Sequence, residues 1–171
     1  MTEKQGLHSY VKFLLFLSSY IPLFVVLILL HYNNEAFVIG LAGIIVLTLF
    51  FLGLLFKLSE RIGSYHFKIS DFENTNEMSL EYIITYIFPL LFLDFTNLGV
   101  VAALFVIFLT IGYIYIRSDL IYMNPVLNLF GYNIYKARIG SANIVIISKR
   151  DTAEIGAHKL VQLAKNVYLG R

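Results

Sequence analysis

Four histidines, His8, His31, His66 and His158, are the side chains of this sequence best suited to metal binding or proton transfer. Imidazole serves both purposes in proteins, but it needs other polar groups close by to do so. None of the four has a partner at the spacing of metal ligands, and the chain contains no cysteine. We therefore interpret the histidines as surface or interface residues and predict no metal site.

Other catalytic patterns are missing from the sequence as well. Gly140-Ser141 is not followed by the Gly-Lys-Ser/Thr of a phosphate-binding loop, and no Gly-x-Ser-x-Gly turn presents a nucleophile. The sequence therefore predicts no catalytic residue and no cofactor, and it favours a non-enzymatic protein.

The elements that must position any functional group are long apolar segments. Of the 171 residues, 58% are hydrophobic and 14% are charged, whereas soluble domains carry about 25% charged residues. Four apolar blocks approach the roughly 20 residues that cross a bilayer as a helix: residues 13–30, 36–56, 80–95 and 98–116. The predicted fold is an α-helical membrane protein with four transmembrane helices in residues 1–116 and a small cytoplasmic β-containing (α+β) tail in residues 117–171.

The third block is the least regular. It holds Glu81 near its start and Asp94 near its end, and Pro89 inside it predicts a kink, since proline removes a backbone donor. A re-entrant segment is the alternative. No other ionisable residue lies in a block, which argues against the ion-coupling site of a secondary transporter but not against a pore built from several copies. The hydroxyls in the blocks are expected to bond to their own helices: Ser18, Ser19, Thr48, Thr85 and Thr110.

The basic residues fix a predicted orientation. All 13 Lys and Arg residues lie in the N-terminal segment, the loop 57–79 or the tail from 117, and none lies in the loops 31–35 and 96–97. Because cytoplasmic segments carry the Lys/Arg excess, both ends of the chain are predicted to be cytoplasmic. The outer loops are very short, so a receptor for a bulky external ligand is not favoured.

Small residues four positions apart suggest two helix-packing faces. Ala36 and Gly40 form one such pair, and Gly99 and Ala103 form the other. Small side chains let helices approach closely in a bilayer. Either pair could also be incidental, since glycine and alanine are common in membrane spans.

The cytoplasmic segments favour short strands. Residues 64–70 alternate between apolar and polar side chains, which is typical of a half-buried strand, and residues 71–76 are expected to form a turn. In the tail, 132–137 and 143–148 read as a hairpin around Gly140-Ser141, 157–165 as a short helix, and 166–169 as a strand. These pieces predict a sheet of three or four strands, and residues 118–133 are expected to lie along the membrane surface.

The run from Arg117 to Lys136 resembles the KwaA family, the membrane subunits of the Kiwa anti-phage defence system. The likeness rests on Asn124-Pro125-x-Leu127 and Phe130-Gly131-Tyr132-x-x-Tyr135, with a similar closing Asn166-Val-Tyr-Leu169. The resemblance implies a bacterial inner-membrane protein that meets lipid, assembles as a homo-oligomer with a tetramer favoured, and acts beside a soluble partner, KwaB, that carries the DNA-directed role. No direct nucleic acid binding is expected. The candidate partner or oligomer interface is Arg117, Asp119, Asn124, Pro125, Phe130, Gly131, Tyr132, Tyr135 and Lys136.

Three functions follow from these observations. The first is a non-enzymatic membrane sensor and scaffold that recruits or regulates a cytoplasmic effector. The second is an oligomeric pore that depolarises the cell. The third, a lipid-modifying enzyme, lacks any catalytic constellation. For Asn124, Pro125 and Gly131 the alternative is that they only turn the chain at the membrane surface.

Overall fold

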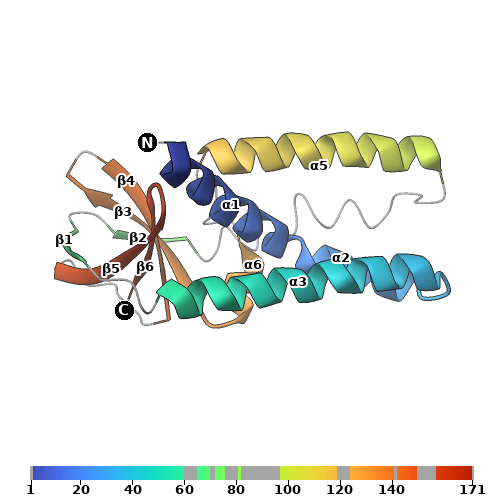
Figure 1. The fold of residues 1–171 in the computed structure, drawn as a ribbon, viewed down its shortest axis with the longest axis horizontal. Coiled ribbons are helices and arrows are strands. Elements are labelled where there is room, and N and C mark those ends of the chain that lie inside the picture. The colour runs from blue at the N-terminus through green and yellow to red at the C-terminus, as the bar shows by residue number, and fades with distance from the viewer. Residues whose placement is uncertain are drawn as a thin grey trace.

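The computed structural model describes residues 2–59, 65–69, 72–75, 81, 97–118, 124–140, 142–149 and 157–170. Its helices are α1 (Thr2–Ser19), α2 (Ile21–Leu30), α3 (Glu35–Ser59), α5 (Leu98–Ser118) and α6 (Pro125–Leu129). Its strands are β1 (Tyr65–Lys68), β2 (Phe72–Asn74), β3 (Asn133–Ile139), β4 (Ala142–Ser148), β5 (Ala157–Ala164) and β6 (Val167–Gly170). The sheet lies at one end of the molecule and α3 and α5 extend away from it (Figure 1).

Helices α3 and α5 are the two described helices that are each long and apolar enough to cross a membrane. They confirm helices for the predicted spans 36–56 and 98–116. Each begins at an asparagine cap, because Asn34 Oδ1 accepts from Phe37 N at 3.2 Å and Asn97 Oδ1 accepts from Gly99 N at 2.8 Å. Only 11% of each apolar stretch is buried within the molecule.

The first predicted span, 13–30, is not one straight helix. Helices α1 and α2 meet at Tyr20 with a bend of 42°. Pro22, in the first turn of α2, cannot donate to the carbonyl of Ser18, and its ring crowds that carbonyl. If the bent pair counts as one span, the described residues hold up to three. The predicted span 80–95 with Pro89 and Thr85 lies outside the described residues, apart from Glu81.

The strands form one six-stranded sheet in the order β1-β5-β6-β4-β3-β2, in which only the β4–β6 pair is parallel among those described. The β3–β4 hairpin matches the prediction, and Gly140 takes the left-handed conformation at its turn, with φ 58°. The prediction of three or four strands was too low, since residues 72–74 form a strand against β3 rather than part of a turn.

The prediction of a helix over 157–165 was wrong, because this segment is strand β5. The spacing of its apolar residues resembles that of a helix because the strand does not alternate regularly. The β5–β6 register shifts between Gln162 and Ala164. Such a bulge interrupts the alternation of faces along a strand. As a result Leu163 and Ala164 are both buried in the same cluster, although they are consecutive.

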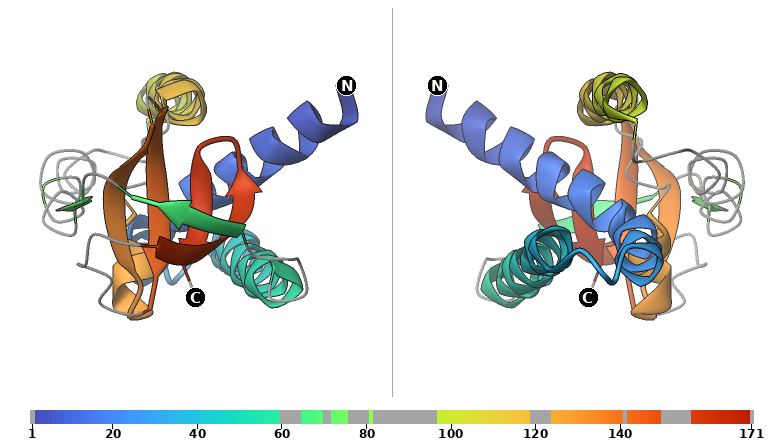
Figure 2. Two further views of the ribbon diagram at one scale, coloured as in Figure 1. Left: turned by 90° about the vertical axis from the view of Figure 1, so that its left-hand side faces the viewer. Right: turned by 90° about the vertical axis from the view of Figure 1, so that its right-hand side faces the viewer.

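The sheet must be strongly curved. Strands β1 and β2 are its two edges, yet only three residues separate Lys68 from Phe72. A flat six-stranded sheet would put its edges roughly 24 Å apart at about 4.8 Å per strand. Four Cα steps reach at most about 15 Å. The short connection therefore holds the two edges close together, and Figure 2 shows the resulting curl of the strands.

Two apolar clusters cover the two faces of the sheet. On one face Tyr135, Ile146 and Leu160 pack with Ile69 from the β1–β2 connection. On the other face Ile134, Ile147, Val161 and Leu163 join Leu15 and Phe16 of α1 and Leu52 of α3. The second cluster is continuous from the sheet into the helices. Helix α1 packs against the strands and so links the sheet and the long helices in one core (Figure 2).

Candidate functional site at the α6 junction

Helix α6 is a short helix whose two ends are both capped by the residues that carry the family resemblance. Asn124 Oδ1 accepts from the backbone N–H groups of Val126 at 3.1 Å and Leu127 at 3.3 Å, and Pro125 occupies the first turn. Gly131, with φ 76°, follows the C-terminus. The N–H of Gly131 bonds to Asn128 O at 2.9 Å and that of Tyr132 to Leu127 O at 2.9 Å. This pair of bonds forms a Schellman motif, in which a glycine in the left-handed conformation ends the helix.

Asn124 also ties α6 to the bend in the first helix pair. It is fully buried. Its Nδ2 donates to the backbone oxygen of Leu15 and to Ser18 Oγ, each at 2.8 Å. Both acceptors lie in the last turn and a half of α1, directly before the break at Tyr20. One amide therefore caps α6 with its oxygen and holds α1 with its nitrogen.

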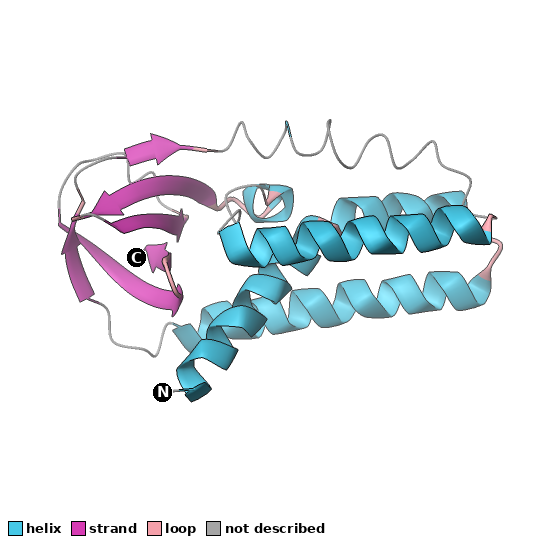
Figure 3. Ribbon diagram, turned by 90° about the horizontal axis from the view of Figure 1, so that it is seen from above, coloured by secondary structure: helices cyan, strands magenta, loops and turns pink. Residues whose placement is uncertain are grey.

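The opposite end of α6 contacts α3. The ring of Tyr132 lies 4.9 Å from the ring of Phe56, centroid to centroid, and Lys149 Nζ lies 4.9 Å from the centroid of Tyr132. Figure 3 shows the sheet at one end of the long helices. We call this region the α6 junction, meaning residues 124–132 together with Leu15, Ser18 and Phe56.

Helix α1 packs against α5 beside this junction. The ring of Phe16 lies 5.0 Å from that of Phe108 and 5.3 Å from that of Tyr115. Gly112 permits the approach, because a Cβ there would lie 2.9 Å from Phe16 Cε1. Lys12, only 8% exposed, donates to the backbone oxygen of Ile116 at 3.3 Å. This bond satisfies a carbonyl in the last turn of α5, where a positive charge is favoured.

The other predicted interface residues do not share one surface. Tyr135 is in the sheet core and is 1% exposed, whereas Phe130 is 55% exposed. Lys136 is half-buried on β3 opposite Glu73. Arg117 is exposed and donates to the Tyr113 hydroxyl at 2.9 Å. Asp119 lies outside the described residues. The structure thus brings Asn124, Pro125, Phe130, Gly131 and Tyr132 together around α6, whereas Arg117, Tyr135 and Lys136 lie elsewhere.

The predicted helix-packing pairs lie at exposed positions of α3 and α5. Ala36, Gly40, Gly99 and Ala103 are all exposed. A Cβ at Gly40 would meet nothing within 4 Å, and one at Gly99 would meet only the Asn97 side chain. The close helix contact is at Gly112, which spacing alone did not single out. Whether the exposed pairs meet a second chain stays a prediction.

The described hydroxyls of the apolar helices behave as predicted. Thr48 donates to Ile44 O at 2.7 Å and Thr110 to Val106 O at 2.8 Å. Ser18 and Ser19 bond to Leu15 O at 2.8 Å and Phe16 O at 2.6 Å. The Tyr115 hydroxyl is buried beside Tyr20 and Asn124 without a hydrogen bond to any residue that the structure describes.

Ionisable groups do not gather into a reactive centre in the described ranges. No group of three or more His, Asp or Glu residues there could hold a metal ion. The ring of His31 lies against Phe37, 5.3 Å between centroids, at the turn between α2 and α3. Burial raises the pKa of the Tyr168 hydroxyl on β6 above 10.0, so this phenol stays neutral at physiological pH.

Comparison with known proteins gives one clear assignment. The family model described as "Anti-phage protein KwaA" matches residues 11–169. The Kiwa protein KwaA of Escherichia coli O55:H7 (strain RM12579 / EPEC) is 29% identical over 92 residues, which cover 54% of this chain and 47% of that protein. The match thus spans about half the length of this curated relative. No solved structure matches significantly. Since the family model covers nearly the whole chain, the α6 junction included, the chain belongs to the KwaA family of anti-phage proteins.

Proposed function

We propose that this chain is a non-enzymatic membrane subunit of an anti-phage defence system. It senses a disturbance of the bacterial inner membrane through its helices and passes it to the cytoplasmic sheet, which recruits or regulates a soluble KwaB-like effector. It works as a homo-oligomer, with a tetramer favoured, and does not itself bind nucleic acid. Membership of the anti-phage KwaA family supports the defence role.

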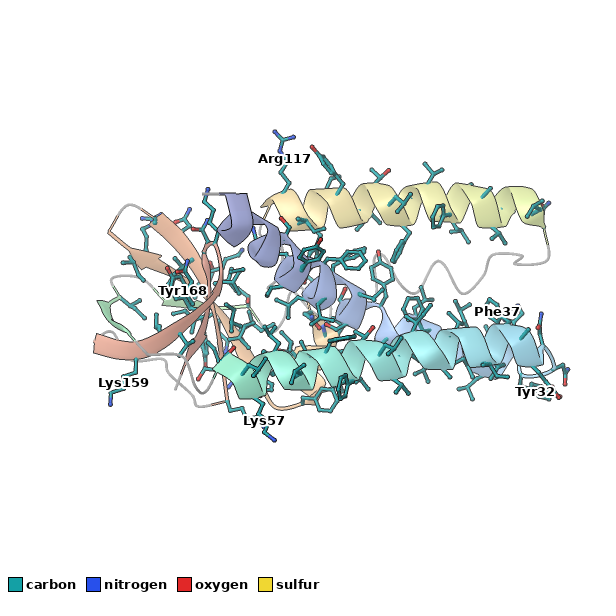
Figure 4. All side chains as sticks on the ribbon, in the orientation of Figure 1. Tyr32, Phe37, Lys57, Arg117, Lys159 and Tyr168 are labelled. Atoms are coloured by element: carbon teal, nitrogen blue, oxygen red, sulfur yellow. The ribbon has the colours of Figure 1, made fainter. Side chains whose placement is uncertain are left out.

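The distribution of charge along the helices supports the orientation. Lys57 of α3, Arg117 of α5 and Lys159 of β5 lie toward the sheet end of the molecule, and Tyr32 and Phe37 lie at the opposite end (Figure 4). Basic residues mark the cytoplasmic side of membrane helices. This pattern supports a cytoplasmic sheet with both chain ends on the same side.

The connectivity supports a fourth crossing. Strand β2 ends at the sheet, whereas α5 begins at the far end of the molecule (Figure 1). The chain between Asn74 and Leu98 therefore has to join the two ends. Four crossings with two short outer turns follow from this arrangement as the proposed topology.

The single observation that carries the proposal is the double attachment of Asn124. Its bonds to Leu15 O and Ser18 Oγ hold α1 next to the bend, and its Oδ1 caps α6, which packs against β3, by accepting from Val126 N and Leu127 N. A switch needs two states that the stimulus biases unequally. A change in the bend between α1 and α2 moves the acceptors of Asn124, and so reaches α6 through this buried side chain, in addition to the direct packing of α1 on the sheet.

Substitution of Asn124 tests this coupling. Asn124→Ala is expected to lower phage protection strongly while the protein still reaches the membrane and still binds its effector in a pull-down. Ser18→Ala, which removes one acceptor and keeps the caps of α6, is expected to give a smaller loss in the same direction. Asn143→Ala, on the exposed part of β4, is the matched control and should protect fully. Full protection by both junction variants would contradict the proposal.

A pore is the second candidate, and one observation favours it. Gly40 and Gly43 lie on exposed positions of α3 with nothing within 4 Å of a Cβ, and Ala36 is exposed one turn earlier. Such a face suits close contact between copies of the chain. Recording from purified protein in planar bilayers separates the two functions. Conductance under the stimulus that triggers defence supports the pore, and silence supports the scaffold.

A further inference from the structure

Two large apolar side chains project from the C-terminal end of α6. Leu129 is 79% exposed and Phe130 is 55% exposed, although both follow a buried stretch that includes Val126 and Leu127. The left-handed Gly131 then reverses the chain, and Tyr132 returns toward the protein. We call Leu129 and Phe130 the α6 tip. The double capping of α6 fixes the direction in which the tip points.

The contact of Tyr132 with α3 sets the level of the tip along that helix. Its ring lies 4.9 Å from the ring of Phe56, the residue before Lys57. In Figure 1, α6 lies within the length of α3 rather than beyond its end. The tip is therefore level with the last apolar turn of α3, where the helix changes from apolar to basic.

The segment that contains the tip carries basic but no acidic side chains. No aspartate or glutamate occurs in the sequence from Asn124 to Lys149. Lys57 and Lys149 are both exposed, and Lys149 lies over the ring of Tyr132. An apolar tip flanked by lysines complements a bilayer interface, which offers acyl chains below anionic headgroups.

The small size of the tip favours lipid over a protein partner. A stable protein interface buries about 800 Å² on each side, far more than two side chains provide. Insertion of one or two apolar side chains into lipid needs no matching pocket and adds to the affinity of basic residues for the membrane.

We propose that Leu129 and Phe130 insert into the bilayer interface that surrounds α3, with Lys57 and Lys149 at the level of anionic phospholipid headgroups. The inference rests on the proposed function in one respect, because α3 has to cross the membrane. The tip then fixes the α6 junction, and with it the sheet, against the cytoplasmic face of the membrane.

The absence of native cysteine allows a clean test. Single variants Leu129→Cys and Phe130→Cys carry an environment-sensitive fluorophore in nanodiscs of phosphatidylcholine with or without phosphatidylglycerol. Nitroxide-labelled lipids report burial in the bilayer, and aqueous iodide reports exposure to water. Phe50→Cys on α3, where the side chain is 63% exposed, is the control for a membrane position. Lys159→Cys, exposed on β5 at the sheet end of the molecule (Figure 4), is the control for a water position.

We expect shallow nitroxides to quench the labels at 129 and 130 at least twofold more than the label at 159, and iodide to show the reverse order. Adding phosphatidylglycerol should raise this quenching. Combining Lys57→Gln with Lys149→Gln should remove the rise, since each lysine shifts insertion by roughly fivefold near an anionic surface.

The controls separate the two ways in which the test can fail. If lipid does not quench the label at 50, the membrane placement of α3 and the proposed function fail together. If lipid quenches the label at 50 but iodide quenches those at 129 and 130 as strongly as that at 159, only the present inference is overturned. Protection of the tip from both quenchers upon effector addition would assign it to a protein contact instead.

Discussion

At the α6 junction, the polar side chains of Asn124 and Ser18 are buried and hydrogen-bonded, whereas the outer parts of α3 and α5 expose large apolar side chains. Asn124 and Ser18 are fully buried beside Leu15 and Phe16. On α3, by contrast, Ile39 and Phe50 are 70% and 63% exposed. No other part of the described chain covers these apolar side chains of α3, so lipid or another protein has to cover them. The difference indicates that the fold is held together at the junction, while the outer parts of α3 and α5 leave apolar surface for lipid or another protein.

The largest contrast is expected for phenylalanines. Phe16 is 1% exposed and packs on Tyr20, Phe108 and Tyr115, so Phe16→Ala should lower the free energy of unfolding by about 3–5 kcal/mol. Phe50→Ala on the exposed side of α3 should change it by less than about 0.5 kcal/mol. Thermal unfolding in detergent micelles measures both, at about 2–4 °C per kcal/mol for a chain of this size. Equal losses would contradict the comparison.

The two helix-capping asparagines, Asn124 and Asn97, allow the buried junction to be compared with the exposed start of α5. Asn124→Ala removes the cap of α6, worth about 1 kcal/mol, and also leaves buried partners on α1 without their donor, worth about 1–2 kcal/mol more. Asn97→Ala removes an exposed cap of α5 and should lose only about 1 kcal/mol. The same unfolding assay compares them, and an Asn124 loss no larger than that of Asn97 would count against the buried link to α1.

Two glycines should respond with opposite signs. Gly112→Ala forces a Cβ to within 2.9 Å of Phe16 Cε1, in a ring cluster with little room to shift, and should destabilise by about 1–3 kcal/mol. Gly40→Ala meets nothing within 4 Å and should stabilise by up to about 1 kcal/mol through helix propensity. A shared sign in detergent would show that Gly112 is not a packing contact.

The smallest effect is expected for lysines. Lys12→Met removes the bond to Ile116 O in the last turn of α5 and should lose about 1 kcal/mol. Lys165→Met, exposed in the β5–β6 turn, should stay within about 0.5 kcal/mol. Chemical unfolding of the two variants under identical conditions resolves a difference of this size, and equal stability of the two would show that the Lys12 bond does not stabilise the contact between α1 and α5.

Sequence alone was sufficient where one local property decides the structure. The apolar runs 36–56 and 98–116 form α3 and α5, as their length and composition predicted. The bend at Tyr20 was missed, although Pro22 signals it, because hydropathy does not register a missing donor. The strand at 157–164 was read as a helix because the bulge between Gln162 and Ala164 depends on pairing with β6, which no local pattern contains.

At the candidate site, the short helix α6 could be predicted from local residues, but its contact with α1 could not. Asn124-Pro125 followed by Gly131 carries the start and stop signals of a short helix, and these signals were present in the sequence. The link from Asn124 to Leu15 and Ser18 spans more than 100 residues. It arises from the shared core of α1 and the sheet, so spacing along the chain could not predict it.

Hydrogen exchange tests most directly whether the junction couples membrane to sheet. Exchange in β3 and β4 is followed for the wild-type chain and Asn124→Ala in nanodiscs of short-chain and long-chain lipids. The account predicts that bilayer thickness alters exchange in β3 and β4 of the wild type and that Asn124→Ala diminishes this response while exchange in α3 still responds. An undiminished response of the sheet in Asn124→Ala would contradict it.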